Sequence, residues 1–417
     1  MTTLDETTAL RAAMVDELRG GLDAIRSEPV ARAFLAVPRH LFAPWTPPEL
    51  VYHPNTSVWP KRDGDGAVVS TVSAAHIQAV MLEQAALAPG LRVLEIGSGG
   101  YNAALISEIV GPDGEVTTVD IDPEIVDRAR TCLDAAGYPH VRTIVADADG
   151  GVPAHAPYDR IVVTVRSWDV PPAWTAQLAP GGRIVLPLRM RGLTRSVALD
   201  QVGAGADGLL LRGGDVRLCS FVPMQGAGAH DEPVVTADGG RIQLRAETDR
   251  DPAHDEDLRA TAEVLASAVR GPRTEVWTGV EFDHVDDLDL WLGMRLPRFG
   301  ILTATQEIVD DGLLTPGVRR GMPTLFSAGG ITYRTKRPVP GTDGFETGVL
   351  AWGSDAAGLA ETYAETVRGW GRYRQAGGSG PGVEIRAAAS VPTDDGAGPR
   401  IVLRKRHTIV VLSWPSP

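Results

Sequence analysis

The sequence contains very little cysteine, with only Cys132 and Cys219 in 417 residues. Two cysteines this far apart provide neither a disulfide framework nor the ligand spacing of a zinc site. We therefore expect two reduced thiols and no metal centre.

Basic residues are also scarce relative to acidic ones. The 40 Lys and Arg residues stand against 53 Asp and Glu, which gives a formal net charge of −13. A general nucleic-acid binder needs a basic surface that displaces counterions from the phosphate backbone. This charge balance argues against that class, and no nucleic-acid partner is expected.

Long apolar runs are missing as well. No stretch of about eighteen apolar residues occurs, so no membrane span is predicted. The N-terminus, Met1-Thr-Thr-Leu-Asp-Glu, lacks the basic start and apolar run of a signal peptide. We expect a soluble, cytoplasmic protein.

The middle of the first half shows a regular alternation of short apolar runs and helical segments. The 417 residues of the whole chain suit two domains, and 43% hydrophobic residues suffice for a sizeable core. The expected strands cover residues 92–96, 116–121, 141–146, 160–165 and 183–187, and the helices between them cover residues 102–110, 123–136 and 172–178. This alternation predicts an α/β fold with a doubly wound, Rossmann-like parallel sheet.

The flanking segments lack this alternation. Helical spacing at residues 4–26 and 74–88, with a Pro-rich extended stretch at 44–60 between them, predicts a cap in front of the sheet. Residues 224–240 are rich in Gly, Ala and acids, and we place a domain boundary there. The expected domains are residues 1–225, with the cap and the sheet, and residues 226–417, an α+β domain.

The α+β domain is expected to contain two helices and several strands. The helices are expected at residues 256–269 and 355–373. The strand candidates include residues 274–280, 288–292, 300–305, 323–326, 330–335, 348–352, 383–391 and 400–413.

A glycine-rich turn follows the first strand of the alternating region, in Glu95-Ile-Gly97-Ser-Gly99-Gly100. Glycines let backbone N–H groups approach a ligand closely, and the helix start behind them offers unpaired donors. Such loops serve several nucleotide ligands, and a plain strand-to-helix turn is about as probable as a ligand loop on this signal alone.

Acidic residues at three consecutive strand ends make the ligand more specific. Asp120 ends the strand after Glu95 and suits the two ribose hydroxyls of an adenosine, whereas Asp147 suits the adenine amino group. A dinucleotide site favours a glycine at position 102, which is Asn102 here, and Glu95 suits a ligand with an ammonium group. Together these residues predict a site for S-adenosyl-L-methionine.

Motifs in this order resemble the protein L-isoaspartyl O-methyltransferase family over roughly residues 30–225. The matching segments are Val37-Pro-Arg-His-Leu-Phe42, Thr71-Val-Ser73-Ala-Ala-His76-Ile-Gln78, Val93-Leu-Glu-Ile-Gly97, Gly100-Tyr-Asn-Ala-Ala104, Val119-Asp120-Ile-Asp122, Ala146-Asp147-Ala-Asp-Gly150 and Phe221-Val-Pro223. The resemblance implies a carboxyl O-methyltransferase with the Rossmann-like fold and S-adenosyl-L-methionine as cofactor.

The sequence departs from the family pattern in three places. Gly99 and Gly100 are adjacent, whereas the family usually has Ser or Thr between them. Gln78 stands where a His is common, and Ala75 where the family has Pro. The chain also continues far beyond residue 225, where family members usually end soon after.

The shortened loop and the long extension resemble a branch of the family found with ribosomally made, modified peptides: FxLD-type lanthipeptides, graspetides and lasso peptides. The resemblance implies esterification of a chosen Asp in a precursor peptide, followed by collapse to an aspartimide (succinimide) or an isoaspartate. Two alternatives remain: a repair enzyme for isoaspartyl sites in damaged proteins, and an inactive peptide-binding homologue. The extension is expected to recognise peptide; the alternative is that it only covers the sheet or mediates dimerisation.

The resemblance assigns candidate site residues. The candidates for cofactor binding are Thr71, Val72, Gln78, Glu95, Gly97, Ser98, Gly99, Gly100, Tyr101, Asp120, Ile121, Asp147 and Ala148. The candidates for substrate binding are Tyr52, His53, Ser73 and His76.

Methyl transfer to a carboxylate needs little acid–base help, because an Asp with a pKa of about 3.9 is already ionised at neutral pH. Ser73 is the candidate catalytic group, orienting that carboxylate through its hydroxyl; the alternative is that Ser73 caps the following helix. A basic cluster at residues 400–407 is either a solvated face or a surface that attracts an acidic peptide.

Overall fold

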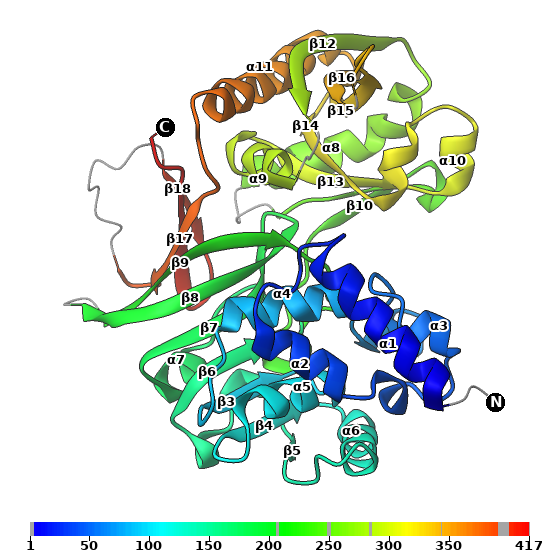
Figure 1. The fold of residues 1–417 in the computed structure, drawn as a ribbon. Coiled ribbons are helices and arrows are strands. Elements are labelled where there is room, and N and C mark those ends of the chain that lie inside the picture. The colour runs from blue at the N-terminus through cyan, green and yellow to red at the C-terminus, as the bar shows by residue number, and fades with distance from the viewer. Residues whose placement is uncertain are drawn as a thin grey trace.

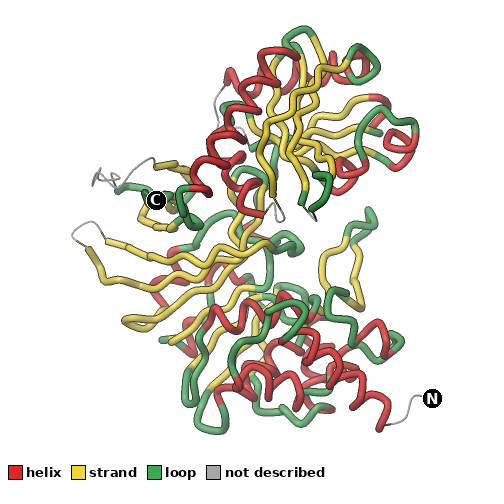
Figure 2. Tube along the Cα trace, turned by 45° about the horizontal axis from the view of Figure 1, so that its top comes forward, coloured by secondary structure: helices red, strands yellow, loops and turns green. Residues whose placement is uncertain are grey.

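The computed structural model describes residues 4–205, 208–247, 252–282, 286–342, 344–390 and 400–416. Figure 1 shows a lower part with the first sheet and the N-terminal helices, and an upper part with the helices α8 (Pro252–Ala268), α9 (Asp286–Arg295), α10 (Gln306–Asp310) and α11 (Ala356–Gln375). Figure 2 shows the strands of the two parts as separate groups.

The first sheet has ten strands in the order β18-β19-β17-β9-β8-β7-β6-β3-β4-β5. Its parallel half consists of β7 (Leu178–Met190), β6 (Tyr158–Val163), β3 (Arg92–Ile96), β4 (Glu115–Asp120) and β5 (Arg142–Val145). Helices α5 (Tyr101–Val110), α6 (Pro123–Ala135) and α7 (Pro172–Gln177) lie in its connections. This is the predicted Rossmann-like α/β fold, which is confirmed. The parallel strand ends of β3 and β4 meet at one edge, where such folds bind ligands.

Antiparallel strands complete the sheet. The long strands β8 (Leu193–Gly205) and β9 (Gly208–Leu218) follow β7. Beyond them lie β17 (Gly382–Ala387), β19 (Thr408–Ser413) and β18 (Arg400–Arg404), so the end of the chain returns to the first sheet (Figure 1). The division at residue 225 stays a prediction, but residues 382–413 do not belong to the second sheet.

The N-terminal region consists of short helices and one hairpin. The helices are α1 (Leu4–Arg19), α2 (Glu28–Ala36), a short 3-10 turn (Arg39–Phe42), α3 (Pro48–Val51) and α4 (Ala75–Ala85). Strands β1 (Val58–Arg62) and β2 (Val68–Val72) pair in an antiparallel hairpin. The expected helix at 4–26 was too long, because Gly20 and Gly21 follow Arg19 and lower helix propensity.

The second sheet is antiparallel, in the order β10-β11-β13-β14-β15-β16-β12. These strands are β10 (Val234–Ala237), β11 (Ile242–Arg245), β12 (Arg273–Phe282), β13 (Phe299–Ala304), β14 (Met322–Ser327), β15 (Gly330–Pro338) and β16 (Phe345–Gly353). Helices α8 (Pro252–Ala268), α9 (Asp286–Arg295), α10 (Gln306–Asp310) and α11 (Ala356–Gln375) accompany them.

Alternation along β16 places α8 and α11 on opposite faces of this sheet. Val349 and Ala351 belong to the buried cluster that contains Leu359 of α11, whereas Leu350 belongs to the cluster that contains Leu258 of α8. Neighbouring side chains of a strand point to opposite faces. The helix α11 therefore fills the side that turns toward the first sheet.

The expected strand at residues 288–292 was wrong, because the structure has α9 there. The Leu-Asp-Leu-Trp-Leu sequence alternates like a half-buried strand over too few residues to distinguish it from a helix. Leu288, Leu290 and Leu292 are all buried in the largest apolar cluster, which also contains Leu188 of β7. The core is thus continuous between the two sheets. No described helix has both the length and the apolar character that a membrane crossing requires.

Candidate active site

A cleft of about 1060 Å³ opens at the carboxyl ends of β3 and β4. Its walls come from the segment 68–78, the loop after β3, and residues 218–223 after β9. The residues predicted from the sequence that line it are Thr71, Val72, Ser73, His76, Gln78, Glu95, Gly97, Ser98, Gly99, Tyr101 and Asp120. The cleft thus brings together segments that are far apart in the sequence.

The glycine loop is held in place by its neighbours. Gly97 has a φ of +98°, and a Cβ there would lie 2.6 Å from the Thr164 hydroxyl oxygen. That hydroxyl donates to the carbonyl of Gly97 at 2.8 Å, and the Ser98 N–H donates to Asp120 at 2.9 Å. The Ser98 hydroxyl is buried and has no hydrogen-bond partner among the described residues. A bound polar group would supply one.

The two adjacent glycines have different surroundings. A Cβ on Gly99 would meet only the Thr71 carbonyl oxygen, at 3.6 Å, and Gly99 lines the cleft. Gly100 has a φ of +79°, and its Cβ would lie 3.2 Å from Phe42 and 3.3 Å from Ala129. Gly100 therefore lets α5 pack against its neighbours, and it is not among the cleft-lining residues.

Glu95 is fully buried and lines the cleft. Its carboxylate accepts hydrogen bonds from Asn102 at 2.9 Å and Thr118 at 2.6 Å. In the described part of the chain it forms no ion pair with a Lys or Arg. Burial raises the pKa of Glu95 from 4.5 to about 7, against the opposing effect of the two hydrogen bonds. An ammonium group in the cleft would favour its ionised form.

This raised pKa predicts a specific pH dependence of stability. In the folded protein Glu95 keeps its proton up to about pH 7, so its contribution is fully present below pH 4.5 and is lost as pH rises through about 7. We expect the free energy of unfolding to fall by up to about 3 kcal/mol over this window because of Glu95. Urea unfolding between pH 5 and pH 8 measures this fall, and Glu95→Gln should remove it. An equally steep fall in the variant would contradict the assignment.

The expected adenosine-binding acids lie around a smaller neighbouring cavity. This cavity of about 40 Å³ is lined by Gly97, Asp120, Ile121, Asp147 and Ala148, among others. Burial raises the pKa of Asp120, whose oxygens accept from the N–H groups of Ser98 and Asp122. Both acids predicted for adenosine thus face one space next to the main cleft.

Asp147 has a partner that the sequence did not indicate. Its carboxylate accepts from the Ala227 N–H at 2.8 Å and the Asp149 N–H at 3.0 Å. The start of the C-terminal extension therefore lies directly on Asp147, the acid expected to bind the adenine amino group.

Ser73 and His76 both line the cleft. The alternative role for Ser73 was wrong: α4 begins at Ala75, Ala74 is its N-cap, and no side chain caps it. The Ser73 hydroxyl is thus not used as a helix cap. The His76 Nδ1 atom is buried without a hydrogen-bond partner among the described residues, and burial lowers the pKa of His76.

Tyr52 and His53 are not among the residues that line the cleft. The Tyr52 hydroxyl bonds to His40 Nδ1 at 2.8 Å, and its ring is 4% exposed. The His53 ring accepts from the Asn55 N–H at 3.2 Å, and it is Asn55 that reaches the cleft. Tyr52 therefore packs in the N-terminal core and does not face the cleft.

Arg39 is a site-supporting residue that sequence reasoning missed, although it lies in the Val37–Phe42 motif. It is fully buried and donates to Gln78 Oε1 at 2.9 Å and to the Ser73 carbonyl at 2.7 Å. Its guanidinium also lies 4.8 Å from the centroid of the buried Tyr101 ring. Arg39 thus fixes one wall of the cleft, and burial lowers its pKa.

No cluster of three or more possible metal ligands occurs among the described residues. The cleft instead offers carboxylates, hydroxyls and backbone amides. Such groups suit a polar organic ligand with a positive charge and hydroxyl groups.

The first part of the chain matches a known protein family. Residues 10–228 match the protein family described as protein-L-isoaspartate(D-aspartate) O-methyltransferase. The protein-L-isoaspartate O-methyltransferase of Methanopyrus kandleri is 40% identical over 225 residues, which are 54% of this chain and 94% of that protein. The one of Ignicoccus hospitalis is 43% identical over 165 residues, 39% of this chain and 75% of that protein. A solved protein-L-isoaspartate O-methyltransferase covers 90% of this chain and 96% of its own, with 21% identity and a TM-score of 0.47.

Proposed function

The chain belongs to the protein-L-isoaspartate(D-aspartate) O-methyltransferase family, carboxyl methyltransferases that use S-adenosyl-L-methionine, and we propose that it methylates an Asp side chain in a ribosomally made peptide. The methyl ester then gives an aspartimide or an isoaspartate. One observation carries the proposal: the buried carboxyl group of Glu95, which forms no ion pair with Lys or Arg among the described residues, and the carboxylate of Asp120 line the same cleft as Ser73.

The residues of the cleft fit this cofactor. Glu95 would hold its ammonium group, Asp120 its ribose hydroxyls and Asp147 its adenine amino group. The buried Ser98 hydroxyl and the open side of Gly99 leave polar and steric room for it. When bound, the cofactor supplies an electrophilic methyl group.

Methyl transfer then requires only that the residues of the chain position the acceptor carboxylate and exclude water from it. The acceptor carboxylate is ionised at neutral pH, so no base is needed. Ser73 donates a hydroxyl hydrogen bond to that carboxylate and holds it in line, and the surrounding walls strip water from it. In the later step the next backbone nitrogen of the peptide attacks the ester carbonyl. A C–N bond forms, and methanol leaves with the amide proton.

The extension supports a dedicated peptide substrate. Its first residues bond to Asp147, and its last strands complete the sheet next to β9. A repair enzyme must accept many sequences and gains little from an extra recognition surface. Repair of isoaspartyl sites remains the second candidate, favoured by the names of the relatives. An inactive peptide-binding homologue is the third, supported only by the shortened loop.

One experiment distinguishes the three candidates. The full chain and labelled S-adenosyl-L-methionine are incubated with a generic isoaspartyl peptide and with a precursor peptide encoded beside the gene. We expect label in the precursor peptide, and mass spectrometry should show one added methyl on an Asp followed by loss of methanol. Label in the generic peptide alone would make the chain a repair enzyme. Absence of label in both would favour the inactive homologue.

A further inference from the structure

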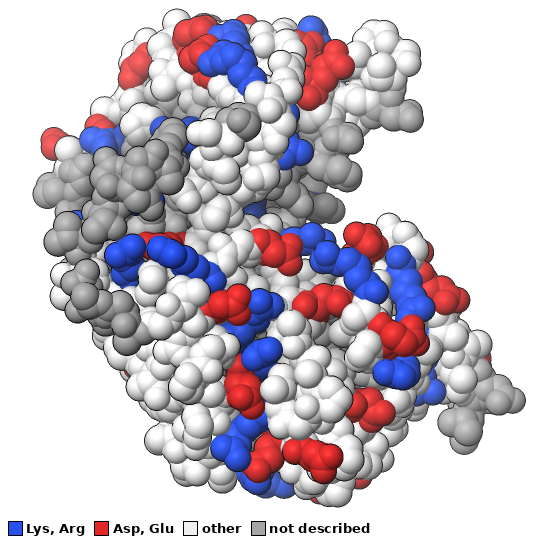
Figure 3. Space-filling model, turned by 60° about the vertical axis from the view of Figure 1, so that its left-hand side comes forward, with Lys and Arg blue, Asp and Glu red and all other residues white. Residues whose placement is uncertain are grey.

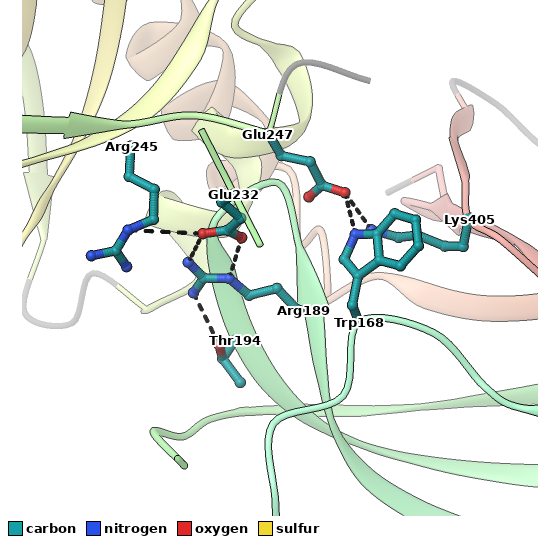
Figure 4. Close-up of polar contacts among 7 residues, drawn as sticks. All are labelled: Trp168, Arg189, Thr194, Glu232, Arg245, Glu247 and Lys405. Atoms are coloured by element: carbon teal, nitrogen blue, oxygen red, sulfur yellow. Dashed lines mark hydrogen bonds and ion pairs between the residues drawn. The ribbon is translucent and has the colours of Figure 1, made fainter. Parts of the chain in front are cut away.

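A second cavity of about 350 Å³ lies where the extension meets the first sheet. The first part of the chain contributes Arg166, Trp168 and Arg189, and the extension contributes His230, Glu232 and Arg245. Figure 4 shows Arg189 and Arg245 converging on Glu232 from different elements. Neither part forms this cavity alone.

Positive charge exceeds negative charge in this cavity. Arg189 and Glu232 form a two-point ion pair at 2.6 Å, and their side chains are 9% and 7% exposed. Arg245 reaches the same carboxylate only at 4.0 Å, because Arg189 already occupies both oxygens (Figure 4). Glu232 is therefore largely neutralised by Arg189, which leaves Arg245 with little compensation.

The positive charge of Arg166 is neutralised even less than that of Arg245. Among the described residues no hydrogen bond or ion pair to its guanidinium is found. Burial lowers the pKa of Arg166, and the charges of Arg189 and Arg245 act in the same direction, against the charge of Glu232. Asp231 is exposed at the rim. With three guanidiniums, Glu232 and Asp231, the cavity has one surplus positive charge, which suits a singly charged carboxylate better than a doubly charged phosphate.

One wall of the cavity is held by a ring stack and by buried polar contacts. The rings of Trp168 and His230 stack at 3.8 Å, and the Trp168 indole donates to Glu247 at 2.5 Å (Figure 4). Lys405 pairs with the same Glu247 at 2.7 Å, with its side chain 1% exposed. The buried Nε2 atom of His230 has no hydrogen-bond partner in the described part of the chain. A polar ligand group would satisfy it.

The cavity adjoins the methyl-transfer cleft. Arg166 follows Val165, which lines that cleft, and its backbone bonds to Val222 at 2.8 Å and Met224 at 3.0 Å. Pro223 lines the cleft, the cavity of about 40 Å³ beside Asp120 and Asp147, and this cavity. A peptide whose acceptor Asp lies near Ser73 would have neighbouring residues within reach of Arg166.

We propose that this cavity binds a second carboxylate of the peptide substrate, an Asp or Glu side chain near the acceptor Asp, through Arg166 and Arg245. The proposal rests on the proposed function, because it gives that function its substrate class: acidic peptides. Figure 3 shows acidic and basic side chains interspersed over one face, with no patch of a single sign. On that face, attraction of an acidic peptide would therefore need a local site such as this one.

The test compares matched peptides and matched variants of the full chain. The peptides share one acceptor and differ by Glu or Gln, placed in turn at each flanking position. For at least one position we expect the Glu peptide to have a KM and a Kd about tenfold lower than the Gln peptide, with equal kcat. In Arg166→Gln/Arg245→Gln this preference should disappear, while the Gln peptide and cofactor binding keep their wild-type values. Arg372→Gln, which changes an exposed side chain of α11, is the control for a lost surface charge.

The outcomes separate this proposal from the proposed function. If no peptide is methylated but the Glu peptides still bind better, the result supports carboxylate binding in the cavity and contradicts the proposed methylation. Methylation of both peptides with equal KM at every position would overturn the cavity proposal alone. So would a preference that survives in the double variant, or inorganic phosphate competing strongly without any Glu preference.

Discussion

Replacing Asp120 with alanine is expected to lower the affinity for S-adenosyl-L-methionine by at least about a hundredfold. Asp120 lines both the main cleft and the cavity of about 40 Å³ that it shares with Asp147. Each hydrogen bond from a ribose hydroxyl to a charged acceptor contributes about 1.5–3 kcal/mol, and two of them are lost. Isothermal titration with S-adenosyl-L-methionine measures the change directly, and methyl transfer should fall with it.

Asp120 also has structural contacts that the experiment must separate from ligand binding. It accepts from the N–H groups of Ser98 and Asp122, so alanine loosens the glycine loop as well. Asp122→Ala is the matched control: Asp122 caps α6 and pairs with Lys61, and its loss costs about 1 kcal/mol of stability. Cofactor affinity should survive in this control. Unchanged affinity in a folded Asp120→Ala protein would mean that the site is misplaced.

The sequence predicted the parallel half of the first sheet because its signals are local. Each short strand is followed by a turn and a helix. An acid at the end of such a strand lies at the ligand-binding edge of the sheet, independently of how the rest of the chain folds. Glu95, Asp120 and Asp147 follow this logic, and the structure places all three around adjoining spaces.

The return of the chain end to the first sheet had no such signal. Alternation at residues 400–413 predicts strands but not their partners, and the pairing of β17 with β9 joins residues about 170 positions apart. This pairing also changes how the extension can be tested. Removing residues 226–417 would strip three strands from the first sheet and expose its core, so point variants such as Arg245→Gln are the sharper probe.

The side chains that meet in the second cavity could not be predicted from the sequence. The basic cluster at residues 400–407 was considered as a face for acidic peptide, yet Lys405 is buried against Glu247. The surplus charge lies instead with Arg166 and Arg245, which are isolated in the sequence. Only the packing of the extension on the first sheet brings them together.

Alanine substitutions at two glycines of the loop, Gly97 and Gly99, are expected to differ in their effect on stability. Gly97→Ala should lower the free energy of unfolding by about 2–4 kcal/mol, because φ is +98° and the new Cβ would lie 2.6 Å from Thr164. Gly99→Ala should leave stability within about 1 kcal/mol of the wild type, because its Cβ would meet nothing closer than 3.6 Å. Urea unfolding of both variants measures this difference.

Cofactor affinity should respond in the opposite pattern to stability. In Gly99→Ala the added methyl group projects where the backbone would approach the ligand, so we expect a stable protein with at least about tenfold weaker cofactor binding. That result would show that the shortened loop, with Gly100 committed to packing against Phe42, still uses Gly99 to cradle the cofactor. Wild-type affinity in Gly99→Ala would mean that the missing residue has moved the loop away from the ligand. The inactive, peptide-binding alternative would then gain its first structural support.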